Sequence, residues 1–126
     1  MAEKKKILIV EDETPLREAL RDKLNREGYQ AIEATDGEDG LAKATQEHPD
    51  LIMTDIMMPK MDGFALLGKL QTDASLNTIP VVIISNLGQD TDRDQAKKLG
   101  AKEFFIKSDM PVSDIITYVH TLFADK

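Results

Sequence analysis

The sequence contains no cysteine, and this absence excludes two classes of protein. A chain without cysteine is not a disulfide-stabilised scaffold, and it has no thiol of its own for redox chemistry. Its 126 residues correspond to one domain. A chain of this length buries roughly two-thirds of its unfolded surface, so we expect it to fold without a disulfide or a structural metal.

Basic residues and long apolar runs are also scarce. The chain has 16 basic and 23 acidic residues, which gives a net charge of −7. This excess of acid disfavours direct binding to nucleic acid or to an anionic membrane surface. No apolar run approaches the length of a membrane span, and the run at residues 7–10 is too short for a signal peptide. We therefore expect a cytoplasmic protein whose partners include neither nucleic acid nor membrane.

Two common functional signatures are missing as well. The chain has no Walker motif and no dinucleotide-binding glycine motif. Its two histidines, His48 and His120, are too few and too dispersed to form a metal site. We interpret both histidines as surface or packing residues.

Short apolar runs alternate along the chain with segments of helical periodicity. The runs predict strands at residues 7–10, 29–34, 50–55, 79–84 and 103–106, and the periodic segments predict helices at residues 14–28, 62–70, 89–99 and 111–122. Leu41 and Ala44 mark a further short helix that ends near His48, after a break at residues 36–37. Thr14 is the expected N-cap of the first helix, with Pro15 at the first helical position. This alternation predicts an α/β fold, in which five helices cover both faces of a doubly wound, five-stranded parallel sheet.

Polar side chains follow four of the predicted strands at their carboxyl ends. These residues are Glu11, Asp12, Asp55, Ser85 and Lys107. The carboxyl ends of parallel strands lie at one edge of the sheet, where ligands bind. If the first and third strands are neighbours, Glu11, Asp12 and Asp55 converge, and such a cluster requires a cation. Mg²⁺ suits a site of a few carboxylates and water.

A carboxylate at this edge also suggests phosphoryl chemistry. Asp55 is placed to attack phosphorus and form an acyl phosphate. Ser85 and Lys107 would then offer hydrogen-bond donors to the anionic transition state. Each residue alone is more often a turn residue, a helix cap or a surface lysine. Their joint placement at the strand ends favours a common site.

Four motifs in this order resemble the receiver domain of two-component response regulators, of the chemotaxis-regulator type. The motifs are ILIVEDE at residues 7–13, DIMMPKMDG at 55–63, VIIS at 82–85 and GAKEFFIK at 100–107. The resemblance covers about residues 5–123 and implies a flavodoxin-like three-layer sandwich with strand order 2-1-3-4-5. It further implies a single receiver domain over residues 1–126, with no effector domain.

The resemblance implies a role for each residue of the site. Asp55 would accept a phosphoryl group from a histidine kinase or a phosphotransfer protein. Glu11, Asp12 and Asp55 would bind Mg²⁺ together with the backbone carbonyl of Met57. Lys107 would pair with the phosphoryl group. Such a domain is a signalling module that promotes its own phosphorylation and dephosphorylation, and it is not an enzyme in the usual sense.

The resemblance also implies a conformational switch. Ser85 would move to bond the phosphoryl group, and Phe104 would turn inward behind it. The surface that changes would comprise the helix at 89–99, the fifth strand and the last helix, where a downstream effector or a phosphorylation-dependent homodimer would bind. The helix at 89–99 has few apolar residues, so we expect it to be loosely packed.

Several positions depart from the family's pattern. Ser108 replaces the proline that usually follows the lysine, and Asn86 replaces a small residue, which narrows access to the site. Met57 and Leu87 occupy positions that flank the phosphoryl group in this family, and neither side chain can position a hydrolytic water. We therefore expect a long-lived phosphoryl group.

Three other functions compete with this one. A phosphohydrolase of the haloacid-dehalogenase type would have a second aspartate two positions after the first, where this chain has Met57. A flavodoxin would have Ser, Thr and Gly in the loop after the first strand, where this chain has three acids at 11–13. A pseudo-receiver that docks partners without phosphorylation stays open, although the chain keeps every acid and the lysine.

Overall fold

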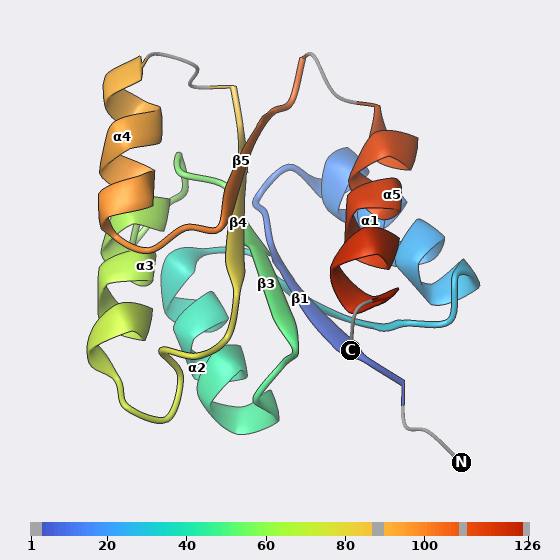
Figure 1. Cartoon of the computed structure of the whole chain (residues 1–126), viewed down its shortest axis with the longest axis horizontal. Helices are drawn as coiled ribbons and strands as arrows, with labels where there is room; N and C mark the ends of the chain where they lie inside the picture. The colour runs from blue at the N-terminus through green and yellow to red at the C-terminus, as the bar shows by residue number, and fades with distance from the viewer. Residues whose placement is uncertain (1–3, 87–89, 109–110, 125–126) are drawn as a thin grey trace.

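The computed structural model describes residues 4–86, 90–108 and 111–124, which form a parallel sheet between two layers of helices (Figure 1). The strands are β1 (Lys6–Val10), β2 (Gln30–Ala34), β3 (Leu51–Thr54), β4 (Val81–Ser85) and β5 (Glu103–Ile106). The helices are α1 (Thr14–Arg26), α2 (Gly37–Glu47), α3 (Gly63–Thr72), α4 (Asp90–Lys98) and α5 (Val112–Ala124). The strand order is β2-β1-β3-β4-β5, so the predicted doubly wound fold and its strand order are confirmed.

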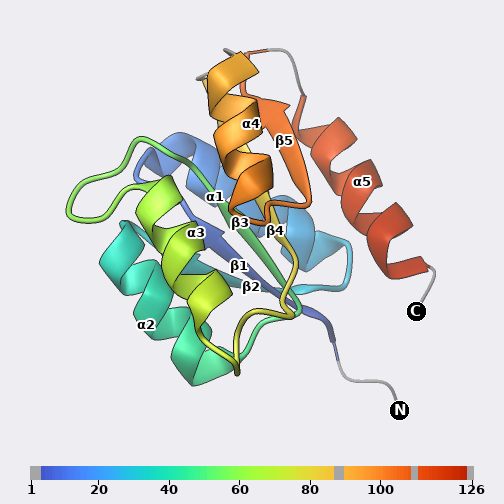
Figure 2. The ribbon, with the colours of Figure 1, turned by 60° about the vertical axis from the view of Figure 1, so that its left-hand side comes forward.

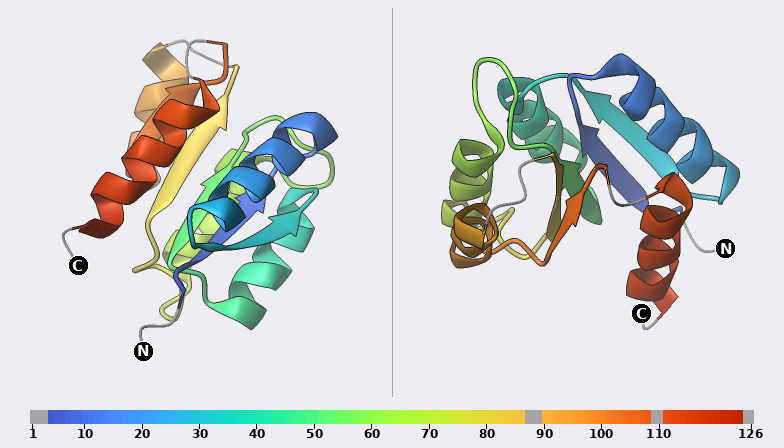
Figure 3. Two further views of the ribbon diagram at one scale, coloured as in Figure 1. Left: turned by 90° about the vertical axis from the view of Figure 1, so that its right-hand side faces the viewer. Right: turned by 90° about the horizontal axis from the view of Figure 1, so that it is seen from above.

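The two helical layers rest on opposite faces of the sheet. Helices α2, α3 and α4 cover one face, which is turned forward in Figure 2, and α1 and α5 cover the other (Figure 3, left). Side chains alternate between the faces along each strand: Leu8 and Val10 pack under the first layer, whereas Ile7 and Ile9 pack under the second. Strands β3 and β4 are therefore buried on both sides, which explains their unbroken apolar runs.

The start of α1 differs from the prediction by one residue. The Arg17 N–H donates to the carbonyl of Glu13 at 3.0 Å, which is already a helical bond, so Glu13 rather than Thr14 is the N-cap. The Glu13 side chain makes no cap hydrogen bond. At the other end, Gly28 has a φ of 95°, a left-handed conformation that glycine adopts without steric cost and that ends the helix as predicted.

Helix α4 is held by few contacts, as predicted. Ala96 is its one buried residue in the described range Asp90–Lys98, and Leu99 beyond the helix is half-buried. The predicted first residue, Gln89, lies outside the described part of the chain. Within the described residues, no helix is long and apolar enough to cross a membrane.

Candidate functional site

The pairing of β1 with β3 brings the predicted acids together. Val10 lies opposite Thr54 in the sheet, and the Asp55 N–H donates to the Val10 carbonyl at 3.1 Å. The residues that follow these two strands therefore meet at one edge, which faces the viewer in the right panel of Figure 3. One carboxylate oxygen from each of Glu11, Asp12 and Asp55 lies within 4.8 Å of the others.

The Asp55 carboxylate is held by three hydrogen bonds. Its side chain is only 6% exposed. The Oδ1 atom accepts hydrogen bonds from the backbone N–H groups of Ile56 (2.6 Å) and Met57 (3.4 Å), and Oδ2 accepts one from Lys107 Nζ at 2.7 Å. The turn after β3 thus holds the Oδ1 atom, while the Oδ2 atom faces the ammonium group of Lys107.

Lys107 connects three carboxylates. Its Nζ lies 2.7 Å from Asp55 Oδ2, 3.0 Å from Glu11 Oε1 and 2.8 Å from Glu13 Oε1. The backbone positions the residue too, because its N–H donates to the Ser85 carbonyl at 2.9 Å. Burial favours the neutral amine, but the bonds to Asp55, Glu13 and Glu11 outweigh it and raise the pKa of Lys107 above its usual value. The lysine is therefore a fixed cation at any physiological pH.

The carboxyl group of Glu11 has a raised pKa in this cluster. Burial, reinforced by the charge of Asp55, raises the pKa of Glu11 from 4.5 to about 7, although bonds from the Glu13 N–H and from Lys107 oppose the shift. A cation bound by the cluster would relieve this crowding.

The raised pKa of Glu11 predicts a pH-dependent stability in metal-free protein. Between pH 4.5 and 7 the folded state retains a proton that the unfolded state has lost, so the free energy of unfolding falls as the pH rises through this range. Replacing Glu11 by Gln should remove this fall and stabilise the protein by at most about 3 kcal/mol at pH 8, with little change at pH 4. Urea unfolding of both proteins in chelator measures the difference. Parallel pH profiles would contradict the prediction.

Three of the acids, the lysine and the serine line one pocket of about 270 Å³, and Glu11 is not part of its lining. Its lining residues are Asp12, Glu13, Asp55, Met57, Ser85, Asn86 and Lys107. Ser85 is buried at the end of β4, whereas Met57 is 65% exposed and stands out among the described residues as a large apolar side chain in solvent. Asn86 lines the pocket as expected from its position. All peptide bonds of the described residues are trans, including the bond between Lys107 and Ser108.

The donor set of this pocket fits a hard divalent cation. Three carboxylates converge, no histidine joins them among the described residues, and Asp12 is open to solvent. Mg²⁺ prefers such oxygen ligands and keeps several waters. The structure gives no position for the Met57 carbonyl relative to a metal, so that ligand stays a prediction.

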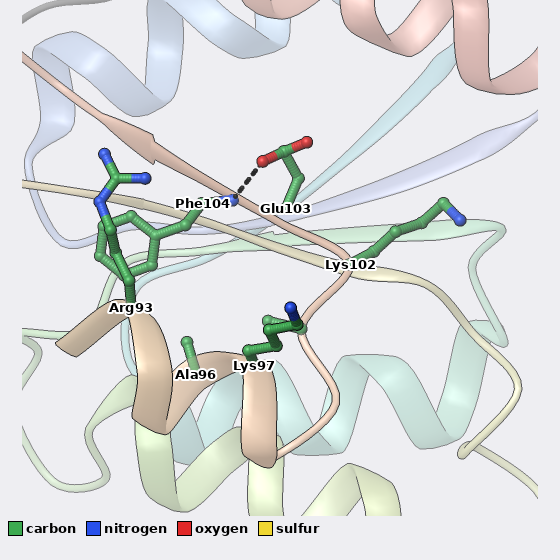
Figure 4. A pocket seen from close by; sticks show the side chains of 7 residues that line it. Arg93, Ala96, Lys97, Lys102, Glu103 and Phe104 are labelled. Carbon is green, nitrogen blue, oxygen red and sulfur yellow. Dashed lines mark hydrogen bonds between the residues drawn. The ribbon is translucent and has the colours of Figure 1, made fainter. Parts of the chain in front are cut away.

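Phe104 lies apart from this pocket, on the face of β5 that is covered by α4. Its side chain is 9% exposed and already packs in the core beside Ala96. The guanidinium carbon of Arg93 lies 5.2 Å from the centre of the Phe104 ring. A second pocket of about 260 Å³ opens next to this pair, with Lys97 rising from α4 and Lys102 on the far side (Figure 4).

Two features of the site are not among the predictions made from the sequence. Glu13 reads as part of an acidic turn, yet it forms the third ion pair of Lys107. Gly63 reads only as a loop breaker, but a Cβ at this position would collide with the backbone carbonyl of Asp55 and lie 2.7 Å from Ile56 Cα. A signal for Glu13 exists in the sequence, because it is one more acid at the end of β1. No sequence pattern reveals the close approach at Gly63.

The chain belongs to the response regulator receiver domain family, whose family model matches residues 7–119. Receiver domains act in phosphorylation-based signalling as modules that interact with histidine kinases and effector domains.

Two curated relatives differ in how much of their own length this chain matches. Protein PilH of Pseudomonas aeruginosa is 38% identical over 102 residues, which cover 81% of this chain and 84% of that protein. The probable transcriptional regulator ycf27 of Cyanophora paradoxa is 38% identical over 108 residues, which cover 86% of this chain but 44% of that protein. The chain therefore spans less than half the length of this relative.

Solved structures share the fold closely. The CheY-like receiver domain protein of Methanospirillum hungatei has a TM-score of 0.89 at 24% identity, with 98% of this chain and 96% of that chain covered. The signal receiver domain of a histidine kinase from Syntrophus aciditrophicus has a TM-score of 0.86 at 32% identity, with 96% and 91% covered. The first of these likenesses supports the fold alone.

Proposed function

We propose that the chain is a phosphorylation-dependent switch in which Asp55 accepts a phosphoryl group from a histidine kinase or phosphotransfer protein in the cytoplasm. The observation that carries this proposal is the buried Asp55, whose Oδ2 lies 2.7 Å from Lys107 Nζ beside two further acids. A carboxylate oxygen of Asp55 attacks phosphorus, the oxygen–phosphorus bond forms, and the bond to the phosphohistidine nitrogen breaks. Lys107 pairs with the transferred oxygens, which carry negative charge throughout.

Mg²⁺ would be held by Glu11, Asp12 and Asp55, with the Met57 carbonyl as a fourth ligand. Its contribution when bound is to neutralise charge on the carboxylates and on the phosphoryl oxygens. The chain's own residues then orient the reaction: the N–H groups of Ile56 and Met57 hold Asp55 Oδ1 in place. A domain of this kind is not a conventional enzyme, because the transferred group stays on its own side chain.

The output of the switch would be a changed surface at α4, β5 and α5. Phosphorylation replaces the single negative charge of the Asp55 carboxylate with a phosphoryl group that carries about −1.5 to −2 charges, and its oxygens draw the Ser85 hydroxyl and Lys107 toward it. Phe104 would respond as the aromatic partner of Ser85, and α4 would shift at low cost because Ala96 is its one buried residue in the described range. A downstream effector or a second copy of the chain would bind there. Arg93, Lys97 and Lys102 around the pocket in Figure 4 favour an acidic partner.

The proposal is tested by intact mass after incubation with acetyl phosphate and Mg²⁺. We expect one phosphoryl adduct, which is absent when the metal is chelated. After the donor is removed, the adduct should decay slowly, because the exposed Met57 side chain offers no group that positions a hydrolytic water. No adduct under any condition would favour the pseudo-receiver, which docks partners without phosphorylation. Rapid decay would overturn only the expected lifetime.

A further inference from the structure

The third ion pair of Lys107, with Glu13, has no counterpart in the roles assigned above. Glu13 Oε1 lies 2.8 Å from Lys107 Nζ, nearly as close as Asp55 Oδ2 at 2.7 Å. The two acids differ in their surroundings, because the Glu13 side chain is 57% exposed and that of Asp55 is 6% exposed. Both line the same pocket. Glu13, like Asp12, is therefore an exposed carboxylate of this pocket, and a phosphodonor that enters from solvent meets its charge.

The side chain of Glu13, the residue before α1, is not used by the helix. The side chains that cap helices are mainly those of Ser, Thr, Asp and Asn, which accept a hydrogen bond from the first helical turn. Glu13 is the N-cap of α1, yet its side chain makes no such bond and instead reaches a lysine that lies 94 residues away in the sequence. The Glu13 N–H donates to Glu11 Oε2 at 3.1 Å, which fixes the backbone from which the side chain extends.

We infer that Glu13 determines which phosphodonors the site accepts, an inference that rests on the proposed phosphoacceptor role of Asp55. Its negative charge in the pocket repels anionic small-molecule donors, and its bond to Lys107 withholds one of the three ammonium hydrogens from them. A donor whose leaving group carries positive charge, as a protonated phosphoimidazole does, is repelled less. Glu13 thus favours transfer from a phosphohistidine over transfer from small acyl phosphates.

The experiment compares two donors that differ in the charge of the leaving group. With acetyl phosphate, the Asp55 oxygen forms a bond to phosphorus and acetate leaves with the electron pair of the broken phosphorus–oxygen bond. With phosphoramidate, which is less negatively charged, the phosphorus–nitrogen bond breaks and the nitrogen leaves as ammonia after taking up a proton. Rates of adduct formation are measured by intact mass, at equal Mg²⁺ concentration and low ionic strength.

We expect Glu13→Gln to accelerate uptake from acetyl phosphate by about threefold to tenfold and uptake from phosphoramidate by less than about twofold. The difference should shrink in high salt, because Glu13 is exposed. Glu13→Asp keeps the charge and should retain most of the wild-type preference. The control is Glu18→Gln, which removes a half-exposed carboxylate from α1 away from the pocket and should change neither rate.

A merely structural role for Glu13 would change both rates by one common factor. Equal acceleration with the two donors, or no change with either, overturns the inference and leaves the phosphoacceptor role of Asp55 intact. An absence of adduct with both donors in wild-type protein overturns that role, and the inference with it.

Discussion

Replacing Asp55 by Asn is expected to abolish phosphoryl uptake completely. The amide nitrogen and oxygen of asparagine are poor nucleophiles, whereas the Asp55 carboxylate is held by two backbone N–H groups and by Lys107. The substitution preserves the shape of the side chain. Intact mass after incubation with acetyl phosphate and Mg²⁺ measures the result, and the fold is checked by urea unfolding.

The matched control for this substitution lies next to the other end of the same strand. Asp50 precedes β3 at its other end, where its Oδ2 accepts a hydrogen bond from the Lys6 N–H at 2.8 Å. Because Asn can accept the same bond, Asp50→Asn should fold normally and take up a phosphoryl group at the wild-type rate. An adduct on the Asp55→Asn protein would show that another residue is the acceptor. Loss of uptake in both variants would point to a disturbed fold.

Replacing Gly63 by Ala should destabilise the protein by about 1–3 kcal/mol and slow phosphoryl uptake. The new methyl group would collide with the Asp55 carbonyl and approach Ile56 Cα to 2.7 Å. Both obstacles are backbone atoms, so they cannot rotate away, and the turn that carries Asp55 must shift. The hydrogen bond from the Gly63 N–H to the Ile56 carbonyl, 2.8 Å long, ties the two segments together and limits that shift.

Gly68 provides a comparison within the same helix. It lies in the interior of α3, and a Cβ there would meet no atom within 4 Å. Gly68→Ala should therefore stabilise the protein by about 0.5–1 kcal/mol, because alanine loses less backbone entropy in a helix. Urea midpoints of both variants at an unchanged slope give the two free energies. The steric argument fails if both substitutions shift the midpoint in the same direction.

Most of the fold can be predicted from the pattern of the chain. The apolar runs of β1, β3 and β4 and the periodic segments between them indicate all five strands and all five helices, because a parallel sheet covered on both faces demands that alternation. The strand order is implied by the family that the four motifs resemble. The predicted start of α1 is one residue too late. Thr14 is the better cap by residue type, but the bond from the Arg17 N–H to the Glu13 carbonyl makes Glu13 the N-cap.

The sequence by itself determined which groups stand at the carboxyl edge. Strand ends are local features, so the order of residues alone places Glu11, Asp12, Asp55, Ser85 and Lys107 at that edge. Their chemical types limit the site to acid–cation and phosphoryl chemistry.

Only the tertiary structure decided the distances between these groups and the ion pairs that they form. The register of β1 against β3 sets the spacing of the acids. The position of β5 in the sheet brings the Lys107 ammonium within 3.0 Å of three carboxylates, one of which is Glu13. Distances between residues some fifty or ninety positions apart depend on the packing of whole elements, which local patterns do not encode. The same is true of Gly63, whose importance comes from a backbone carbonyl that reaches it through the fold.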